Sequence, residues 1–260
     1  MIAAVVLGAG KGTRMASSTL PKQFLNLGGS PMIVQTVEKF AVIEEINKIV
    51  VVVSKPWMTH AKDLFKDKHY LDKLIFCEGG NSRQESLLKA CICLKDRFGK
   101  DVGIISHDAA RPFLSIRIIE DNIKQIKEGK ACDTVLPCTD TIVESRDSQV
   151  ISDIANRNYL YQGQTPQSFI CQEYIDAYEK IGITFAEDGT LTLDEKVLDG
   201  ASVQDLKTAF YKDNDLEEIA QKSIRVQANA ISGKYAATVS NYTDSGTYSN
   251  SALSSFLKSI

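Results

Sequence analysis

Short apolar runs alternate with helix-like segments along the first 138 residues, and this alternation limits the possible folds more than any other feature. Five segments have the composition of buried strands: 2–7, 48–54, 73–80, 101–113 and 131–138. Four segments between them carry apolar residues at helical spacing: 31–43, 58–69, 82–98 and 115–130. Strands that alternate with helices predict right-handed crossovers, and therefore an α/β fold with a doubly wound, mostly parallel sheet.

The pattern changes after residue 138. Between about 139 and 162, β-forming residues alternate with polar ones, which predicts a β-arm that leaves the main sheet as an antiparallel excursion. The segment TPQSF (165–169) then leads into a further helix, and 226–260 is rich in Ser, Thr, Asn and Gly. We expect one domain over 1–225 that carries the arm, and a C-terminal extension over 226–260 of unknown role. A small appended element, a subunit contact and partial disorder are all compatible with that extension.

Charge and composition exclude several classes of protein. A net charge of −3 gives no general basic surface, so we expect no nucleic-acid partner. No run of about 18 apolar residues occurs, and no basic region precedes residues 1–7, so we expect neither a membrane span nor a signal peptide. The six cysteines form no C-x-x-C pair and the three histidines are scattered, which makes a zinc site improbable and fits a reduced, cytoplasmic protein.

A glycine-rich loop, LGAGKGTRM (7–15), follows the first predicted strand. Gly8, Gly10 and Gly12 let a ligand approach the backbone closely, and Lys11 and Arg14 indicate that the ligand is an anion. The spacing fits neither the Walker phosphate loop nor the G-x-G-x-x-G fingerprint of dinucleotide-binding folds.

Two further loops follow predicted strand ends, GGNSRQES (79–86) and HDAARP (107–112). In a doubly wound sheet, loops at the carboxyl ends of the strands meet in one crevice. Gly80 and Ser86 suit the approach of a flat base, although an ordinary strand-to-helix loop is equally compatible. Asp108 at a strand end can hold Mg²⁺ against phosphates or can cap a helix. Arg111 fits an ion-pair partner as well as a ligand.

Six segments together resemble the cytidylyltransferases of the methylerythritol-phosphate and ribitol-phosphate type: LGAGKGTRM, LPKQF, GGNSRQES, HDAARPF, DTIVES and NRNYLYQGQTPQSF. They cover residues 1 to about 180. The resemblance implies a Rossmann-like nucleotidyltransferase fold and a reaction in which CTP and a polyol phosphate give a CDP-polyol and pyrophosphate. DTIVES and YLYQGQTPQSF favour the ribitol-phosphate branch, which supplies teichoic-acid or capsule synthesis, whereas HDAARP suits the methylerythritol-phosphate branch equally well.

The resemblance also implies roles for individual residues. Three would be catalytic: Arg14, Lys22 and Lys207. Twelve would bind CTP: Leu7, Gly8, Ala9, Gly10, Lys11, Gly12, Thr13, Gly80, Arg83, Ser86, Ala109 and Arg111. Thr141 and Arg157 would bind the phosphate of the acceptor, and Asp108 and Asp194 would hold Mg²⁺ or another divalent cation. The arm would hook around a second subunit, which implies a homodimer.

The C-terminal part departs from the family pattern. Family members carry a Thr-Asp pair and later an Asn-x-Lys-x-Thr segment, for which Asp194 and Lys207 are the nearest equivalents at a shorter spacing. A helix cap and a solvated lysine are the plainer interpretations of these two residues. The departure leaves open a non-catalytic nucleotide-binding protein of the same fold. A nicotinamide-dependent oxidoreductase is disfavoured because both its glycine fingerprint and a Tyr-x-x-x-Lys pair are missing.

Overall fold

The structure is a computed structural model that describes residues 1–10, 20–145, 148–180, 182–185, 191–200, 241–242 and 248–249. The chain divides into two compact units, Met1–Ser223 and Ile224–Ile260. In the second unit, β13 (Asn241–Tyr242) pairs antiparallel with β14 (Tyr248–Ser249). The functional boundary near residue 225 and the role of the extension stay predictions.

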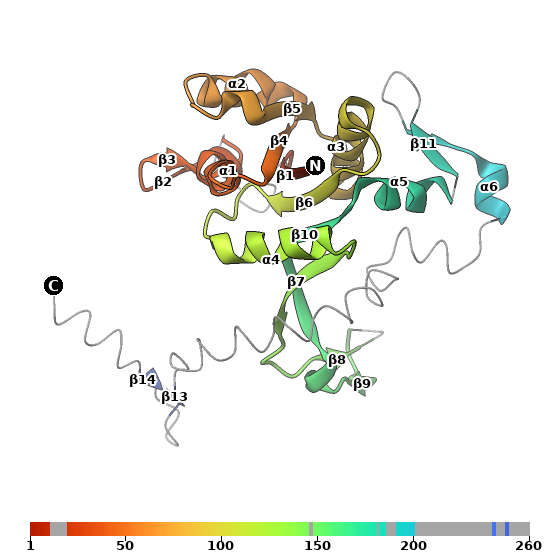
Figure 1. Cartoon of the computed structure of the whole chain (residues 1–260). Helices are drawn as coiled ribbons and strands as arrows, with labels where there is room; N and C mark the ends of the chain where they lie inside the picture. Colours follow the sequence, from red (N-terminus) through yellow and green to blue (C-terminus); the bar gives the residue numbers. More distant parts are fainter. Residues whose placement is uncertain are drawn as a thin grey trace. The chain divides into compact units, whose positions relative to one another are not determined.

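A six-stranded sheet forms the centre of the first unit, in the order β5-β4-β1-β6-β10-β7 (Figure 1). Its strands are β1 (Ile2–Gly8), β4 (Ile46–Val53), β5 (Leu74–Glu78), β6 (Gly103–Asp108), β7 (Cys132–Pro137) and β10 (Tyr161–Ile170). The first four pair in parallel, and β10 runs antiparallel to both β6 and β7. The predicted doubly wound, mostly parallel sheet is confirmed.

Helices connect the strands and cover both faces of the sheet. They are α1 (Met32–Ala41), α2 (Met58–Phe65), α3 (Arg83–Phe98), α4 (Ile116–Lys127), α5 (Cys171–Glu179) and α6 (Glu195–Gly200). Short 3-10 turns lie at η1 (Lys22–Phe24), η2 (Lys55–Trp57), η3 (Leu71–Lys73) and η4 (Arg157–Tyr159). Small ladders join β2 (Asn26–Leu27) to β3 (Ser30–Pro31), and β11 (Ile183–Phe185) to β12 (Leu191–Leu193).

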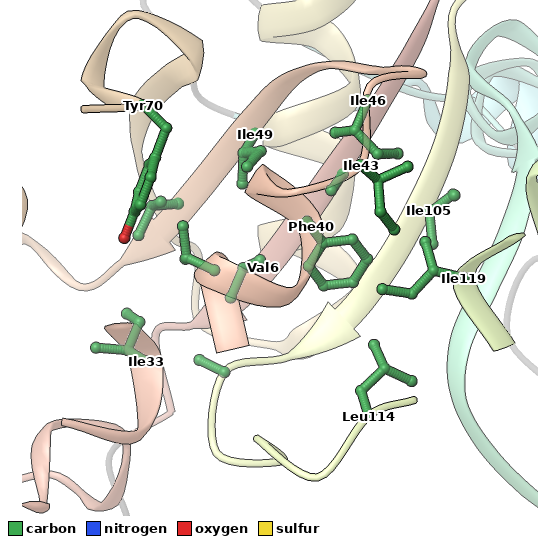
Figure 2. Close-up of a cluster of buried hydrophobic side chains, with 14 of the residues drawn as sticks. Val6, Ile33, Phe40, Ile43, Ile46, Ile49, Tyr70, Ile105, Leu114 and Ile119 are labelled. Carbon is green, nitrogen blue, oxygen red and sulfur yellow. The ribbon is translucent and has the colours of Figure 1, made fainter. Parts of the chain in front are cut away.

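Alternate residues of the central strands belong to two separate hydrophobic clusters, one on each face of the sheet. Ala4 and Val6 of β1 belong to the cluster under α1, α2 and α4, whereas Ala3 and Val5 belong to the cluster under α3 and α5. Figure 2 shows Phe40 of α1 within the first cluster, among side chains of the sheet and of α4. Because β1 is buried on both faces, its sequence is a continuous apolar run and does not alternate.

Strand β10 extends further into the sheet than the sequence indicates. TPQSF, expected as the approach to a helix, forms its second half. Pro166 lacks an N–H donor for a ladder, and the pairing of β10 with β7 is interrupted between Gly163 and Gln167. The proline therefore lies in a β-bulge inside the sheet, and such bulges re-aim neighbouring side chains.

The predicted β-arm lies between β7 and β10. Strands β8 (Val143–Glu144) and β9 (Asp153–Ile154) pair antiparallel, and the Cys138 N–H donates to the Leu160 carbonyl at the base. Figure 1 shows the arm extending beyond the ends of β7 and β10, away from the sheet. An antiparallel excursion from the main sheet is thus confirmed, with most of its residues exposed.

We predict that Gly103→Ala destabilises the fold by about 1–3 kcal/mol, because overpacking a tight core position carries a cost of that size. A Cβ at residue 103 would lie 2.3 Å from Cγ2 of Ile126, which is close to the helix backbone and cannot swing away. The free energy of unfolding in urea measures the effect. Gly200→Ala is the matched control, since a Cβ there meets nothing within 4 Å. Equal stability of the two variants would contradict this packing account.

Candidate active site

The carboxyl ends of four parallel strands lie side by side at one edge of the sheet. Leu7 of β1 is in register with Asp108 of β6, and Gly8 is in register with Val53 of β4. Val53 in turn pairs with Glu78 of β5. The loops that follow β1, β5 and β6 therefore start next to one another, as the topology predicted.

Close backbone approach between two of these loops depends on glycine. A Cβ at Gly79 would lie 2.3 Å from the Cβ of Ala9, so the loop after β5 touches the loop after β1 only because residue 79 has no side chain. Gly8 is similarly enclosed, with the Val52 carbonyl oxygen 3.1 Å and the Ala109 Cβ 3.2 Å from its added Cβ. The start of the glycine loop is thus fixed by packing.

The segment LPKQF is anchored to the same loop. The side-chain amide of Gln23 is buried and donates hydrogen bonds to the carbonyl oxygens of Gly8 and Gly10. Phe24 inserts into the first hydrophobic cluster and packs against Trp57. Lys22 directly precedes these two anchors and is exposed. Within the part of the chain that the structure describes, it forms no ion pair.

Ser86 orders the loop that precedes α3. Its buried hydroxyl oxygen accepts a hydrogen bond from the Gly80 N–H at 3.0 Å, and the hydroxyl donates to the Ser82 carbonyl at 2.7 Å. Ser82 caps α3 by accepting from the Glu85 N–H at 3.0 Å. Binding of a base by Gly80 and Ser86 stays a prediction, and the structure assigns the Ser86 hydroxyl proton to the loop itself.

Glu85 is a residue that the sequence reasoning missed. Its carboxylate accepts from the Asn81 N–H at 2.6 Å and pairs with Lys89 at 3.2 Å. Burial alone would raise the pKa of Glu85, but the Asn81 N–H and Lys89 together lower the pKa below its ordinary 4.5. The signal was readable, because Ser82 followed three residues later by Glu85 is the capping-box pattern.

Asp108 lies between two arginines at the end of β6. Its Oδ1 is 3.5 Å from Nε of Arg83, on the first turn of α3, and its Oδ2 is 3.0 Å from Nε of Arg111. Each guanidinium also contacts a glutamine of β10. Arg83 Nη2 donates to Oε1 of Gln167 at 3.3 Å, and Arg111 Nη1 donates to Oε1 of Gln164 at 2.7 Å. The sequence reasoning assigned no role to either glutamine.

Hydrogen bonds from buried groups fix the backbone next to Asp108. The Ala109 N–H donates to the Leu7 carbonyl, and its carbonyl oxygen accepts from the Thr36 hydroxyl, both at 2.9 Å. His107 is buried next to Phe40 and donates from Nε2 to the Arg111 carbonyl at 3.0 Å. Burial lowers the pKa of His107, so its ring is a neutral packing and hydrogen-bonding group.

The two predicted acceptor residues lie on the arm. Thr141 and Arg157 are both exposed, and Arg157 Nη1 donates across the base of the arm to the Thr139 carbonyl at 3.5 Å. No described contact joins either residue to Asp108, Arg83 or Arg111 of the same chain. The structure therefore places them on an element separate from Asp108, Arg83 and Arg111. These three residues are called the strand-end cluster below.

Asp194 caps a helix. Its Oδ1 accepts from the backbone N–H groups of Lys196 and Val197, at 3.0 and 3.3 Å, at the start of α6. Over the described ranges, no group of three or more His, Cys, Asp or Glu side chains is arranged to hold a metal ion. Metal binding by Asp108 and Asp194 stays a prediction.

Five predicted site residues lie outside the described residues: Lys11, Gly12, Thr13, Arg14 and Lys207. Among the helices that the structure describes, none is long and apolar enough to cross a membrane. All six cysteines are free thiols, and Cys91, Cys132 and Cys171 are buried.

Comparisons with known proteins identify the family. The profile of IspD, 2-C-methyl-D-erythritol 4-phosphate cytidylyltransferase, matches residues 2–206. A ribitol-5-phosphate cytidylyltransferase of Streptococcus pneumoniae (strain Hungary19A-6) is 45% identical over 184 residues, which cover 68% of this chain and 77% of the relative.

Solved structures agree in fold. A 4-diphosphocytidyl-2C-methyl-D-erythritol synthase from Anaerococcus prevotii DSM 20548 has a TM-score of 0.61 at 22% identity, over 82% of this chain and 84% of that one. A 2-C-methyl-D-erythritol 4-phosphate cytidylyltransferase from Francisella tularensis has a TM-score of 0.56 at 25% identity, over 68% and 76%. The fold is that of the cytidylyltransferase structures. The chain belongs to the IspD family of cytidylyltransferases.

We predict that Glu85→Gln weakens the fold by about 0.5–1 kcal/mol at pH 7, because the neutral amide keeps an acceptor for Asn81 but loses the charge that pairs with Lys89. The folded-state pKa of Glu85 is depressed, so its stabilisation is complete above about 4.5 and is lost as the pH falls through the folded value. Unfolding free energies measured from pH 7 to pH 3 should therefore converge for wild type and variant at the acid end. Glu44→Gln, at an exposed site, is the control. A difference that persists unchanged at pH 3 would rule out this role of the charge.

Proposed function

We propose that this chain transfers the cytidylyl group of CTP to D-ribitol 5-phosphate, giving CDP-ribitol and pyrophosphate. The observation that carries the proposal is the 45% identity over 184 residues to a relative described as a ribitol-5-phosphate cytidylyltransferase. The product would serve teichoic-acid or capsule polymer synthesis. A cytoplasmic location follows from the proposed use of CTP.

The strand-end cluster supports a site for the triphosphate. Arg83, Arg111 and Lys22 bring three positive charges to loops that follow β5, β6 and β1, and the carboxylate of Asp108 pairs with the two arginines. An oxygen of the acceptor phosphate attacks the α-phosphorus of CTP in line, and pyrophosphate leaves. The attacking phosphate is already anionic at neutral pH, so positioning and cations supply most of the catalysis and no general base is needed.

We assign Arg14 and Lys22 to the α-phosphate and the leaving group, with Lys207 as a further cation. The backbone N–H groups from Ala9 to Thr13 would cradle the phosphates. Gln23 supports this assignment of Lys22. Its buried side-chain amide donates to the carbonyl oxygens of Gly8 and Gly10, and so ties the turn that contains Lys22 to the glycine loop.

Mg²⁺ is the cofactor that this reaction class implies, and Asp108 offers the kind of oxygen ligand that Mg²⁺ takes. Mg²⁺ in nucleotide sites is commonly held by one or two carboxylates together with the substrate phosphates, so one carboxylate suffices. Asp108 is partly exposed at the end of β6 and is the group that would hold the ion, with Asp194 as the second predicted ligand. When bound, Mg²⁺ neutralises negative charge on the phosphates.

The alternative acceptor is 2-C-methyl-D-erythritol 4-phosphate, which the family profile and the two similar structures favour by name. A turnover panel separates the two. CTP is supplied with each polyol phosphate in turn, pyrophosphate release is measured, and UTP and ATP replace CTP as controls. A higher kcat/KM for ribitol 5-phosphate supports the proposal. Preference for the methylerythritol compound would overturn it in favour of the alternative, and no turnover at all would favour a non-catalytic nucleotide-binding protein.

We also propose that the protein is a homodimer joined through the arm. Three apolar side chains of the arm are largely exposed, Val150 at 65%, Ile151 at 57% and Ile154 at 60%. A two-stranded arm is marginal on its own in water. A second copy that covers the arm would bury these side chains and bring Thr141 and Arg157 to the strand-end cluster of its neighbour.

Lys22→Ala should lower kcat on the order of 100-fold or more, because removing one preorganised donor from developing charge commonly costs that much. Lys39→Ala on α1 removes a lysine away from the loops and serves as the control. Steady-state pyrophosphate release with CTP and ribitol 5-phosphate is the measurement. A folded Lys22→Ala protein with wild-type kcat would remove Lys22 from the site.

Arg157→Ala should raise KM for the polyol phosphate with little change in CTP affinity. A charge-assisted phosphate contact is worth about 1.5–3 kcal/mol, which corresponds to roughly a 10- to 150-fold change. Mixing this variant with Lys22→Ala should restore part of the activity, because one site in a mixed dimer holds both intact residues. Confirmed mixed dimers without recovered activity would contradict completion of the site across subunits.

A further inference from the structure

Two glutamines of β10 hold the arginines of the strand-end cluster. Oε1 of Gln164 accepts from Nη1 of Arg111 at 2.7 Å, and Oε1 of Gln167 accepts from Nη2 of Arg83 at 3.3 Å. In each case residues more than 50 positions apart in the chain are brought together. Neither glutamine belongs to the set that the sequence assigns to CTP, the acceptor or the metal.

Each arginine is consequently fixed at two of its three guanidinium nitrogens. Nε of both arginines faces Asp108, and one terminal nitrogen of each faces a glutamine. Because the guanidinium is planar with a rigid fork of donors, two contacts define its plane. Nη1 of Arg83 and Nη2 of Arg111 take no part in these contacts and keep their donors for an anion.

The chemistry of glutamine suits this task. An amide oxygen orients a guanidinium without neutralising it, whereas a second carboxylate would cancel the charge that binds a phosphate. Asp108 already contributes one negative charge to the pair of arginines. Neutral acceptors on the far side leave the cluster with a net positive charge.

The backbone under both glutamines is itself held in place. Gln167 is in register with Ser106 of β6 and Asp133 of β7, and its carbonyl accepts from the Ser106 hydroxyl at 3.3 Å. Gln164 lies in the bulge, where the Pro166 carbonyl accepts from the buried Thr134 hydroxyl at 2.7 Å. Gln164 from the bulge and Gln167 from the ladder beside it thus reach Arg111 and Arg83, which both face Asp108 at the end of β6.

We propose that Gln164 and Gln167 are positioning residues that hold Arg111 and Arg83 in the orientation that binds the phosphates of CTP. The inference rests on the proposed function for the identity of the anion. Without the tethers, each arginine must be immobilised when the nucleotide binds, which weakens affinity by about threefold to tenfold per side chain.

The test is a double-mutant cycle on the full-length chain, with the CTP dissociation constant measured by calorimetry. Gln164→Leu and Gln167→Leu are each made alone and in the Arg111→Ala and Arg83→Ala backgrounds. We expect Gln164→Leu to weaken CTP binding about threefold to tenfold alone and in Arg83→Ala, and to have no further effect in Arg111→Ala. Gln167→Leu should weaken CTP binding about threefold to tenfold alone and in Arg111→Ala, and should have no further effect in Arg83→Ala. Gln172→Leu on α5, whose partner is Asp176, is the matched control and should bind CTP like wild type.

This pairwise pattern separates positioning from a general structural effect. A loss of packing would weaken CTP binding equally in both arginine backgrounds, and that result would overturn the inference, as would wild-type affinity in both glutamine variants. Turnover is measured separately. If the wild-type chain binds CTP and the variants show the expected coupling, but no cytidylyl group is transferred to a polyol phosphate, only the proposed function is refuted. A wild-type chain that fails to bind CTP would refute both.

Discussion

The carboxylate of Asp108 forms an ion pair with one arginine at each oxygen, Arg83 from α3 and Arg111 from the loop after β6. This pair of contacts joins the crossover after β5 to the crossover after β6, and through the glutamines it extends to β10. Like charges that share one neighbouring carboxylate repel each other, and the carboxylate offsets part of that repulsion. Asp108 therefore helps to hold the two cations side by side.

The buried sheet makes that arrangement possible. β1, β4 and β6 are held between two hydrophobic clusters, so their carboxyl ends form a fixed edge. Irregular backbone at the edge is pinned by buried polar contacts, among them Thr36 to Ala109 and Ser86 to Gly80. The described residues of the arm are mostly exposed, which agrees with its proposed contact with a second copy. The proposed nucleotide site thus lies on the buried sheet, and the proposed acceptor residues lie on the exposed arm.

Strand and helix order could be predicted because the apolar periods are local properties of the sequence. The meeting of the three loops followed from topology alone. The contacts around Asp108 could not be predicted, because Arg83 is far from it in the sequence and the glutamines that hold the arginines lie on β10, where TPQSF was expected to lead into a helix. Ser86 appeared free to read a base, yet its hydroxyl proton is used by Ser82, a contact that depends on the fold of the loop. The Ser82–Glu85 cap could have been predicted from the capping-box pattern in the sequence, but the sequence analysis did not predict it.

We propose that the edge of the sheet around Asp108 is the nucleotide and metal site. The most direct test of this proposal is the Mg²⁺ dependence of pyrophosphate release from CTP in wild type and in Asp108→Asn. The account predicts that the variant folds and still binds CTP without metal, because both arginines keep their charge, while stimulation by Mg²⁺ is lost. An Asp108→Asn enzyme with the same Mg²⁺ dependence and turnover as wild type would contradict it.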